Sequence, residues 1–140
     1  MFAGNIIVHP GYSFPENDFA IIRLSENIPD IPTVVVACLP FNDSAENFAG
    51  KDLTIVGWGT TQTGEPSENL KFGTVTGLSN AHCSRMFESV FAITENMICA
   101  ISKDLTTSVC TGDSGGNNRD SNRAVVGKLN LNGIYCFTCW

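Results

Sequence analysis

The run Cys110-Thr111-Gly112-Asp113-Ser114-Gly115-Gly116 places one serine among glycines, directly after an aspartate. Glycine reaches backbone φ values that residues with a Cβ avoid, so these glycines allow a sharp turn whose amides converge beside Ser114 and bind a developing oxyanion. If Asp113 is buried, its charge needs a partner, for which we expect a cation. The run predicts the loop of a nucleophilic serine, although Gly, Asp and Ser also form ordinary polar turns.

Four further segments precede this loop and strengthen the interpretation. They are, in order, His9-Pro10-Gly11-Tyr12, Asn17-Asp18-Phe19-Ala20-Ile21-Ile22-Arg23-Leu24, Val56-Gly57-Trp58-Gly59 and Asn96-Met97-Ile98-Cys99-Ala100. Together with the serine loop they resemble the trypsin-like serine proteases of the chymotrypsin fold, in which the same segments follow in this order. The resemblance covers most of the chain and implies a serine endopeptidase.

The resemblance implies a catalytic triad, in which a histidine takes the serine proton while an aspartate fixes the histidine tautomer. Asp18 matches the aspartate and Ser114 the nucleophile, with the backbone amides of Gly112 and Ser114 as oxyanion donors. In the family the histidine lies upstream in a Thr-Ala-Ala-His-Cys segment, which these 140 residues do not contain. His9 and His82 lie outside that motif, where a histidine is more often a surface or packing residue. We therefore expect the chain on its own to be inactive.

The amino-terminal segment Met1-Phe2-Ala3-Gly4-Asn5-Ile6-Ile7-Val8 carries no positive residue, and Pro10 interrupts its apolar run. It is too short and too uncharged for a signal peptide, and we interpret it as a strand. The family's Ile-Val-Gly-Gly segment is also absent. Its freed ammonium is the cation that the resemblance implies for Asp113.

The resemblance implies an all-β, chymotrypsin-like double β-barrel with one short helix. Enzymes of this kind commonly have roughly 220 residues or more, whereas this sequence has 140, so we expect an incomplete fold. Residues 1–45 are predicted to be the last strands of the first barrel and the linker, and residues 46–140 to be most of the second barrel, truncated at its carboxyl end. The first-barrel remnant should expose strand edges and apolar side chains.

The local pattern gives the expected elements. Strands are predicted over residues 5–9, 19–24, 53–58, 70–78, 97–100 and 124–131. Ser79 or Asn80 is expected to cap a short helix. Its face of Cys83, Met86, Phe87 and Val90 has helical spacing, which indicates a core-facing stripe.

Six cysteines in 140 residues indicate an oxidising compartment. The resemblance implies an extracellular protein with the disulfides Cys83–Cys99 and Cys110–Cys136, leaving Cys38 and Cys139 unpaired. Cys136 and Cys139 are separated by two residues, but no second pair or nearby histidine completes a zinc set, so we predict no metal site and no cofactor.

The resemblance also suggests how a substrate is selected. Ser108 falls at the floor of the specificity pocket, where an aspartate would recruit Lys or Arg. The neutral hydroxyl favours an apolar or aromatic P1 residue, as in chymotrypsin- or elastase-like enzymes. Asn130 and Asn132 fall on the strand that lines the substrate, and Asn132 replaces a glycine that keeps the pocket open. The implied partner is a polypeptide substrate or a protease inhibitor.

Charge and hydropathy argue against other partners. The net charge is −6, and the eight Lys and Arg residues are scattered, so we expect no nucleic-acid partner. No apolar stretch approaches 18 residues, so we expect no membrane span. Two other interpretations stay open. The chain is either a non-catalytic protease homologue that acts as a binding or regulatory module, or an incomplete gene model of a full secreted protease.

Overall fold

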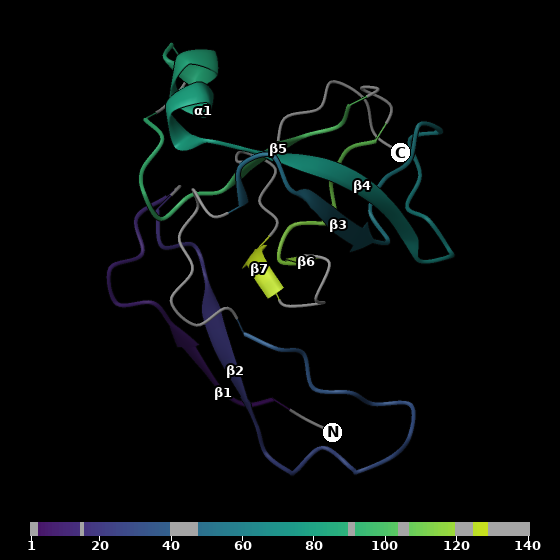
Figure 1. Cartoon of the computed structure of the whole chain (residues 1–140). Helices are drawn as coiled ribbons and strands as arrows, with labels where there is room; N and C mark the ends of the chain where they lie inside the picture. The colour runs from purple at the N-terminus through teal and green to yellow at the C-terminus, as the bar shows by residue number, and fades with distance from the viewer. Residues whose placement is uncertain are drawn as a thin grey trace. The chain divides into compact units, whose positions relative to one another are not determined.

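The structure is a computed structural model that describes residues 3–14, 16–39, 48–89, 92–103, 107–119 and 125–128. Figure 1 shows its strands and its short helix. The chain divides into two compact units, Met1–Ala37 and Cys38–Trp140, which are described separately below. The predicted boundary after residue 45 falls within residues 40–47, outside the described part, and stays a prediction.

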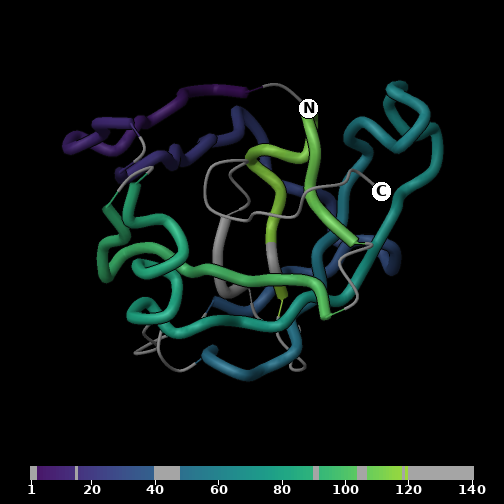
Figure 2. Tube along the Cα trace, turned by 90° about the horizontal axis from the view of Figure 1, so that it is seen from above, coloured from purple at the N-terminus to yellow at the C-terminus, as the bar shows by residue number. Residues whose placement is uncertain are grey.

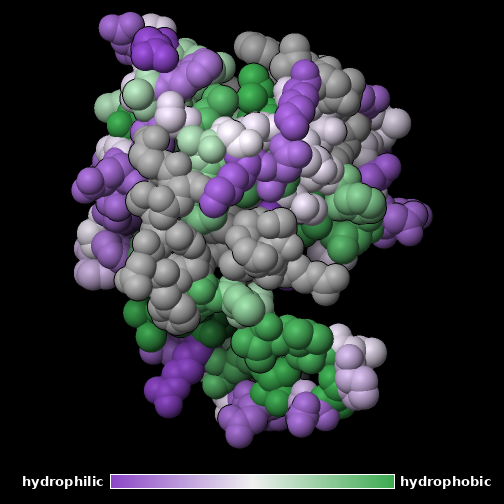
Figure 3. Space-filling model, in the orientation of Figure 1, coloured by the Kyte–Doolittle hydropathy of each residue, from purple (hydrophilic) through white to green (hydrophobic). Residues whose placement is uncertain are grey.

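The first unit contains an antiparallel pair of strands, β1 (Ala3–Val8) and β2 (Ala20–Leu24). Ile6 lies opposite Ile22 and Ile7 lies opposite Ile21, so aliphatic pairs cover both faces. Ile6 is 59% exposed and Ile22 is 58% exposed. Figure 3 shows an extended hydrophobic surface over this unit. The predicted exposure of apolar side chains in this part of the chain is confirmed.

The second unit contains a five-stranded antiparallel sheet in the order β5-β4-β3-β6-β7. Its strands are β3 (Asp52–Gly57), β4 (Lys71–Leu78), β5 (Cys99–Ile101), β6 (Asn117–Arg119) and β7 (Val125–Lys128). Residues of β3 alternate, as a half-buried strand requires, so Leu53 and Ile55 are fully buried. They form a core with Phe48, Val75, Ala100 and Val109.

The strand predictions hold for β3 and β4 to within one residue at each end, but not everywhere. β5 begins two residues later than expected, at Cys99. No strand is predicted over Asn117–Arg119, yet this segment pairs with Thr54 and Ile55 of β3. Asn has a low intrinsic strand preference, so pairing with a buried neighbour decides the structure here.

The helix α1 (Asn80–Phe87) directly continues the trace of β4, as Figure 2 shows. Ser79 is the N-cap, since its side chain accepts a hydrogen bond from the amide of His82, and Asn80 is the first helical residue. Cys83 is fully buried, but Met86 is 45% exposed. The predicted core-facing stripe is therefore wrong at Met86, because Cys83 is the one residue of this short helix that is buried. Val90 lies outside the described residues.

An ion pair on the surface joins the ends of three strands. Lys103, just beyond β5, lies 2.9 Å from the Asp52 carboxylate at the start of β3. Thr76 of β4 donates a second hydrogen bond to Asp52. The Lys103 ammonium, then the Thr76 hydroxyl, hold the pKa of Asp52 below its ordinary value. Both charged groups are well exposed, so the ion pair contributes little to the stability of the fold.

The disulfide Cys83–Cys99 joins α1 to β5, with 6.3 Å between the two Cα atoms. This is the pairing that the resemblance implies. Cys110 is also disulfide-bonded, and Cys136, its expected partner, lies outside the described residues, as does Cys139. Cys38 is a free, exposed cysteine, as expected.

We predict that replacing both Cys83 and Cys99 by alanine lowers the free energy of unfolding by about 3 kcal/mol, because the cross-link closes a short loop in the unfolded chain. The two cysteines are 16 residues apart in the sequence. Urea denaturation under oxidising conditions measures the loss. Cys38→Ala is the matched control and should leave the midpoint unchanged, since Cys38 is free and exposed. An equal midpoint for the double variant and the control would contradict the prediction.

Candidate active site

The serine loop, residues 110–116, follows a buried segment that ends at Val109. Gly112 has φ +99° and Gly115 has φ +92°, in the region that L-residues with a side chain rarely adopt. Two of the three predicted glycine positions thus carry the expected backbone geometry, one on each side of Asp113 and Ser114. Between them Ser114 is exposed and Asp113 is buried. The turn therefore presents the serine outward and directs the aspartate inward.

Asp113 is only 3% exposed, and backbone amides stabilise its charge. The amide of Gly59 donates to Oδ1 at 2.8 Å, and the amide of Cys110 donates to Oδ2 at 2.9 Å. Hydrogen bonds to an ionised carboxylate are among the stronger ones in proteins. These two bonds anchor the residue next to Ser114, and the implied ammonium partner stays a prediction.

The main chain attaches the loop a second time. The amide of Thr60 donates to the carbonyl of Thr111 at 2.8 Å, while inside the loop Asp113 donates to Cys110 and Gly116 donates to Asp113. Among the described residues, no hydrogen bond takes up the amides of Gly112 or Ser114. Donors that stay available beside an exposed serine are what an oxyanion site requires.

Ser108 is 1% exposed and directly precedes Val109, in the segment that the structure describes from residue 107 onward. Its hydroxyl donates to the carbonyl of Val109 at 3.0 Å. A buried, neutral residue at this position fits the expected pocket floor. Its role in selecting substrates stays a prediction, as do those of Asn130 and Asn132, which lie outside the described residues.

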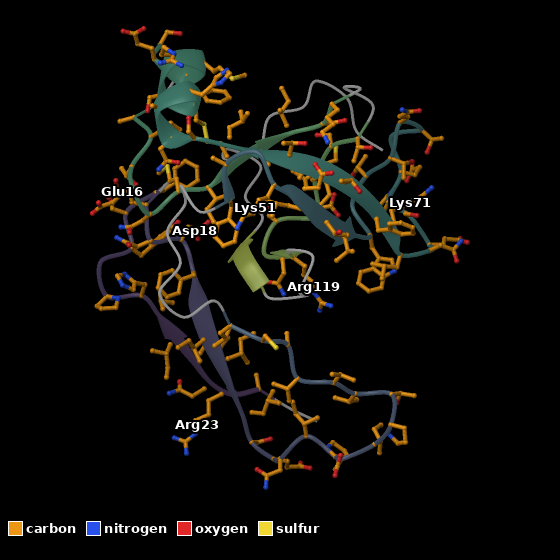
Figure 4. The ribbon with its side chains drawn as sticks, viewed as in Figure 1. Glu16, Asp18, Arg23, Lys51, Lys71 and Arg119 are labelled. Carbon is orange, nitrogen blue, oxygen red and sulfur yellow. A yellow bond between two sulfur atoms is a disulfide. The ribbon has the colours of Figure 1, made fainter. Side chains whose placement is uncertain are left out.

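Asp18 lies in the first unit, at the turn before β2, where Figure 4 labels it. The turn is tight, since the amide of Phe19 donates to the carbonyl of Asn17 at 2.8 Å. Asn17 has φ +52° and its side chain donates to the carbonyl of Gly11. Asp18 itself is half-buried. Ser114 belongs to the second unit, so each candidate triad residue is described within its own unit.

The two histidines occupy structural or surface positions. The Nδ1 atom of His9 accepts a hydrogen bond from the amide of Gly11 at 3.1 Å, and its ring lies 4.7 Å from that of Phe19. His82 is exposed on α1. His9 thus stabilises the turn that precedes Asp18, which agrees with its expected structural role.

Figure 4 labels three charged residues of the second unit. Lys51 directly precedes β3, Lys71 begins β4 and Arg119 ends β6. Within the described part of the chain, no cluster of three or more His, Cys, Asp or Glu side chains has the arrangement of a metal site. No helix among the same residues has the length and apolar character needed to cross a membrane.

The segment Val56-Gly57-Trp58-Gly59 matches the family by resemblance, but the sequence alone assigns it no role. The structure brings this segment against Asp113, although Gly59 and Asp113 are 54 residues apart in the sequence. The available signal was the pair of glycines at the end of a strand, because glycine there often marks close approach of another chain segment. The sequence alone does not say which segment approaches.

Comparison with known proteins agrees with this geometry. The sequence profile of the Trypsin family matches residues 2–136. Venom serine protease 34 of Apis mellifera is 33% identical over 118 residues, covering 79% of this chain and 28% of that protein. Vitamin K-dependent protein C of Oryctolagus cuniculus is 34% identical, covering 79% of this chain and 26% of that protein. The chain thus spans about a quarter of the length of these relatives.

Solved structures give the same result for the fold. Neuropsin, a serine protease of mouse brain, superposes with a TM-score of 0.76 at 27% identity, covering 91% of this chain and 57% of that one. A structure described as GrC superposes with a TM-score of 0.78 at 26% identity, covering 91% and 56%. The expected chymotrypsin-like fold is confirmed, and the described strands close no barrel, as expected for an incomplete one. The chain belongs to the trypsin family of serine proteases.

Proposed function

We propose that Ser114 is the nucleophile of a serine endopeptidase site that acts on secreted or extracellular polypeptides. One observation carries the proposal. Ser114 is exposed on a turn held by Gly112 and Gly115 at positive φ, while the neighbouring Asp113 is buried and bonded to two amides. This arrangement fixes a reactive hydroxyl at the surface with hydrogen-bond donors beside it.

In the proposed reaction the Ser114 hydroxyl attacks the carbonyl carbon of a peptide bond and its proton passes to a histidine base. The amides of Gly112 and Ser114 donate to the oxyanion that forms on the carbonyl oxygen. Asp18 accepts from the histidine and stabilises it when charged. The base itself comes from the family's upstream motif, because the only two histidines of this sequence are His9 and His82. An extracellular location agrees with the disulfide Cys83–Cys99.

An extended chain tests the proposal. It places the first-barrel residues of a trypsin-like relative, beginning at its Ile-Val-Gly-Gly terminus and including the Ala-Ala-His-Cys motif, ahead of this sequence. We predict that a fluorophosphonate labels the extended chain at Ser114, because the added histidine removes the hydroxyl proton. Mass spectrometry of tryptic peptides identifies the labelled residue.

Ser67→Ala is the control, since Ser67 is a loop serine of the same unit whose hydroxyl donates to the carbonyl of Asn69. It should leave labelling unchanged, whereas Ser114→Ala should abolish it. A folded extended chain that stays unlabelled at Ser114 would overturn the proposal and favour the binding or regulatory homologue.

A further inference from the structure

Two glycines of the second unit, Gly57 and Gly59, surround the carboxylate of Asp113. A methyl group at Gly57 would overlap Oδ1 and would lie 2.7 Å from Cγ. At Gly59, a methyl group would lie 2.5 Å from Cγ and 2.6 Å from Oδ1. Carbon atoms that are not bonded to these groups require well over 3 Å, so neither position has room for a side chain while the carboxylate is in place.

The conformation of the backbone does not explain these glycines. The described glycines with positive φ are Gly50, Gly64, Gly112 and Gly115, so a positive φ is not the reason for glycine at positions 57 and 59. Gly57 also ends the regular strand β3, where a side chain would normally add packing. The space that the carboxylate fills is therefore the physical reason for glycine at both positions.

The contact between Gly59 and Asp113 also holds the serine loop against the end of β3. Gly59 donates its amide to Asp113, and the next residue, Thr60, donates to Thr111. Main chain also meets main chain here, because a methyl group at Gly112 would lie 3.3 Å from the Cα atom of Gly59. The end of β3 and the loop are thus joined on both sides of Gly112, one of the two candidate oxyanion donors.

We propose that Gly57 and Gly59 are positioning residues for the candidate active site. They form a cradle, defined as the main chain of Gly57 and Gly59 with the amide of Cys110, that receives the Asp113 carboxylate and thereby sets the position of Ser114 and of the Gly112 amide. The proposal rests on the proposed role of Ser114, but the contact itself does not require any reaction to take place.

A double-mutant cycle on the complete chain isolates the contact. Gly57→Ala should lower the folding equilibrium constant at least 100-fold, because the methyl group displaces a buried, hydrogen-bonded carboxylate. In an Asp113→Ala background the same substitution should cost less than threefold, since the nearest remaining atom, the Asp113 Cβ, is 3.4 Å away. A cost that is equal in both backgrounds would overturn the proposal, because the glycine would then matter for another reason.

If Asp113→Ala does not fold, hydrogen exchange measured by NMR on the glycine variants tests the contact instead. In Gly59→Ala and Gly57→Ala, the amides of Gly59 and Cys110 should exchange at least tenfold faster, because they lose their carboxylate acceptor. The amide resonances of Gly112 and Ser114 should move as well. Amides at the centre of β4, such as that of Val75, should keep their protection. Unchanged exchange at Gly59 and Cys110 would overturn the cradle, and unchanged resonances of Gly112 and Ser114 would overturn its positioning role.

Gly11→Ala is the matched control. Gly11 is exposed, has no positive φ, and a methyl group there would contact the His9 ring at 3.3 Å. It should leave the exchange of the Gly59 and Cys110 amides unchanged. Neither the double-mutant cycle nor the exchange measurement requires Ser114 to react. Failure of fluorophosphonate labelling would therefore leave the cradle intact. Loss of the coupling between Gly57 and Asp113 would overturn the cradle, and labelling would still decide whether Ser114 is the nucleophile.

Discussion

Peptide hydrolysis by the extended chain should fall by about 10⁶-fold when Ser114 is replaced by alanine, the size of loss seen when a serine protease loses its nucleophile. Asp18→Asn should lower turnover by about 10⁴-fold, because the asparagine holds the histidine in the wrong tautomer. The 140-residue chain itself should stay at the level of uncatalysed hydrolysis, since its two histidines are His9 and His82. Turnover of a chromogenic peptide, with active-site titration to count competent molecules, measures all three.

One control variant accompanies this prediction. Asn17→Ala changes the residue before Asp18 and should affect the turn more than the chemistry, so its effect on turnover should be much smaller than that of Asp18→Asn. Hydrolysis by the 140-residue chain that disappears with Ser114→Ala would contradict the expectation, because it would show that His9 or His82 supplies the base.

The extended chain should also cleave after Phe or Leu at least 100-fold faster than after Arg in the same peptide context. Ser108 is neutral and 1% exposed, so a guanidinium that reaches it loses water without gaining a counter-charge. Burying an unpaired charge costs several kcal/mol even after relaxation, and each 1.4 kcal/mol is a factor of about ten. An apolar side chain instead gains roughly 25 cal/mol for each Å² that it buries. Values of kcat/KM for three matched substrates measure the preference.

Ser108→Ala is the control for this preference, because it keeps the position neutral and removes only the hydroxyl that donates to Val109. It should preserve the order of the three substrates. If the Arg substrate is cleaved faster than both the Phe and the Leu substrate, Ser108 is not the pocket floor. Asn132 is expected to narrow the pocket and to favour Leu over the larger rings.

The parts of the fold that local chemistry controls were predictable. β3 follows from alternating apolar residues, and Ser79 caps α1 through a hydrogen bond that its own side chain makes. β6 was not predicted because Asn117–Arg119 becomes a strand through pairing with β3. The local residue preferences do not indicate this pairing. Met86 has helical spacing with Cys83, yet periodicity does not say how many side chains on that face of the helix become buried.

In the candidate site, too, the local turn was predictable and the long-range contacts were not. The turn around Ser114 was predictable because positive φ is a property of single glycines, here Gly112 and Gly115. The surroundings of Asp113 were not, because they depend on a contact between segments 54 residues apart. An aspartate beside a serine indicated burial and a partner, but sequence alone could not show that backbone amides of Gly59 and Cys110 donate to it.

The exposed isoleucines of β1 and β2 determine which part of the chain a denaturation experiment reports on. A two-stranded sheet that leaves Ile6 and Ile22 more than half exposed gains little area on unfolding, so it adds little to the heat capacity change or to the denaturant m-value. Such a pair of strands is at best marginally stable by itself. Calorimetric and urea transitions of the chain therefore report on the sheet built around Leu53 and Ile55, and a local probe such as amide exchange is needed to follow the segment that carries Asp18.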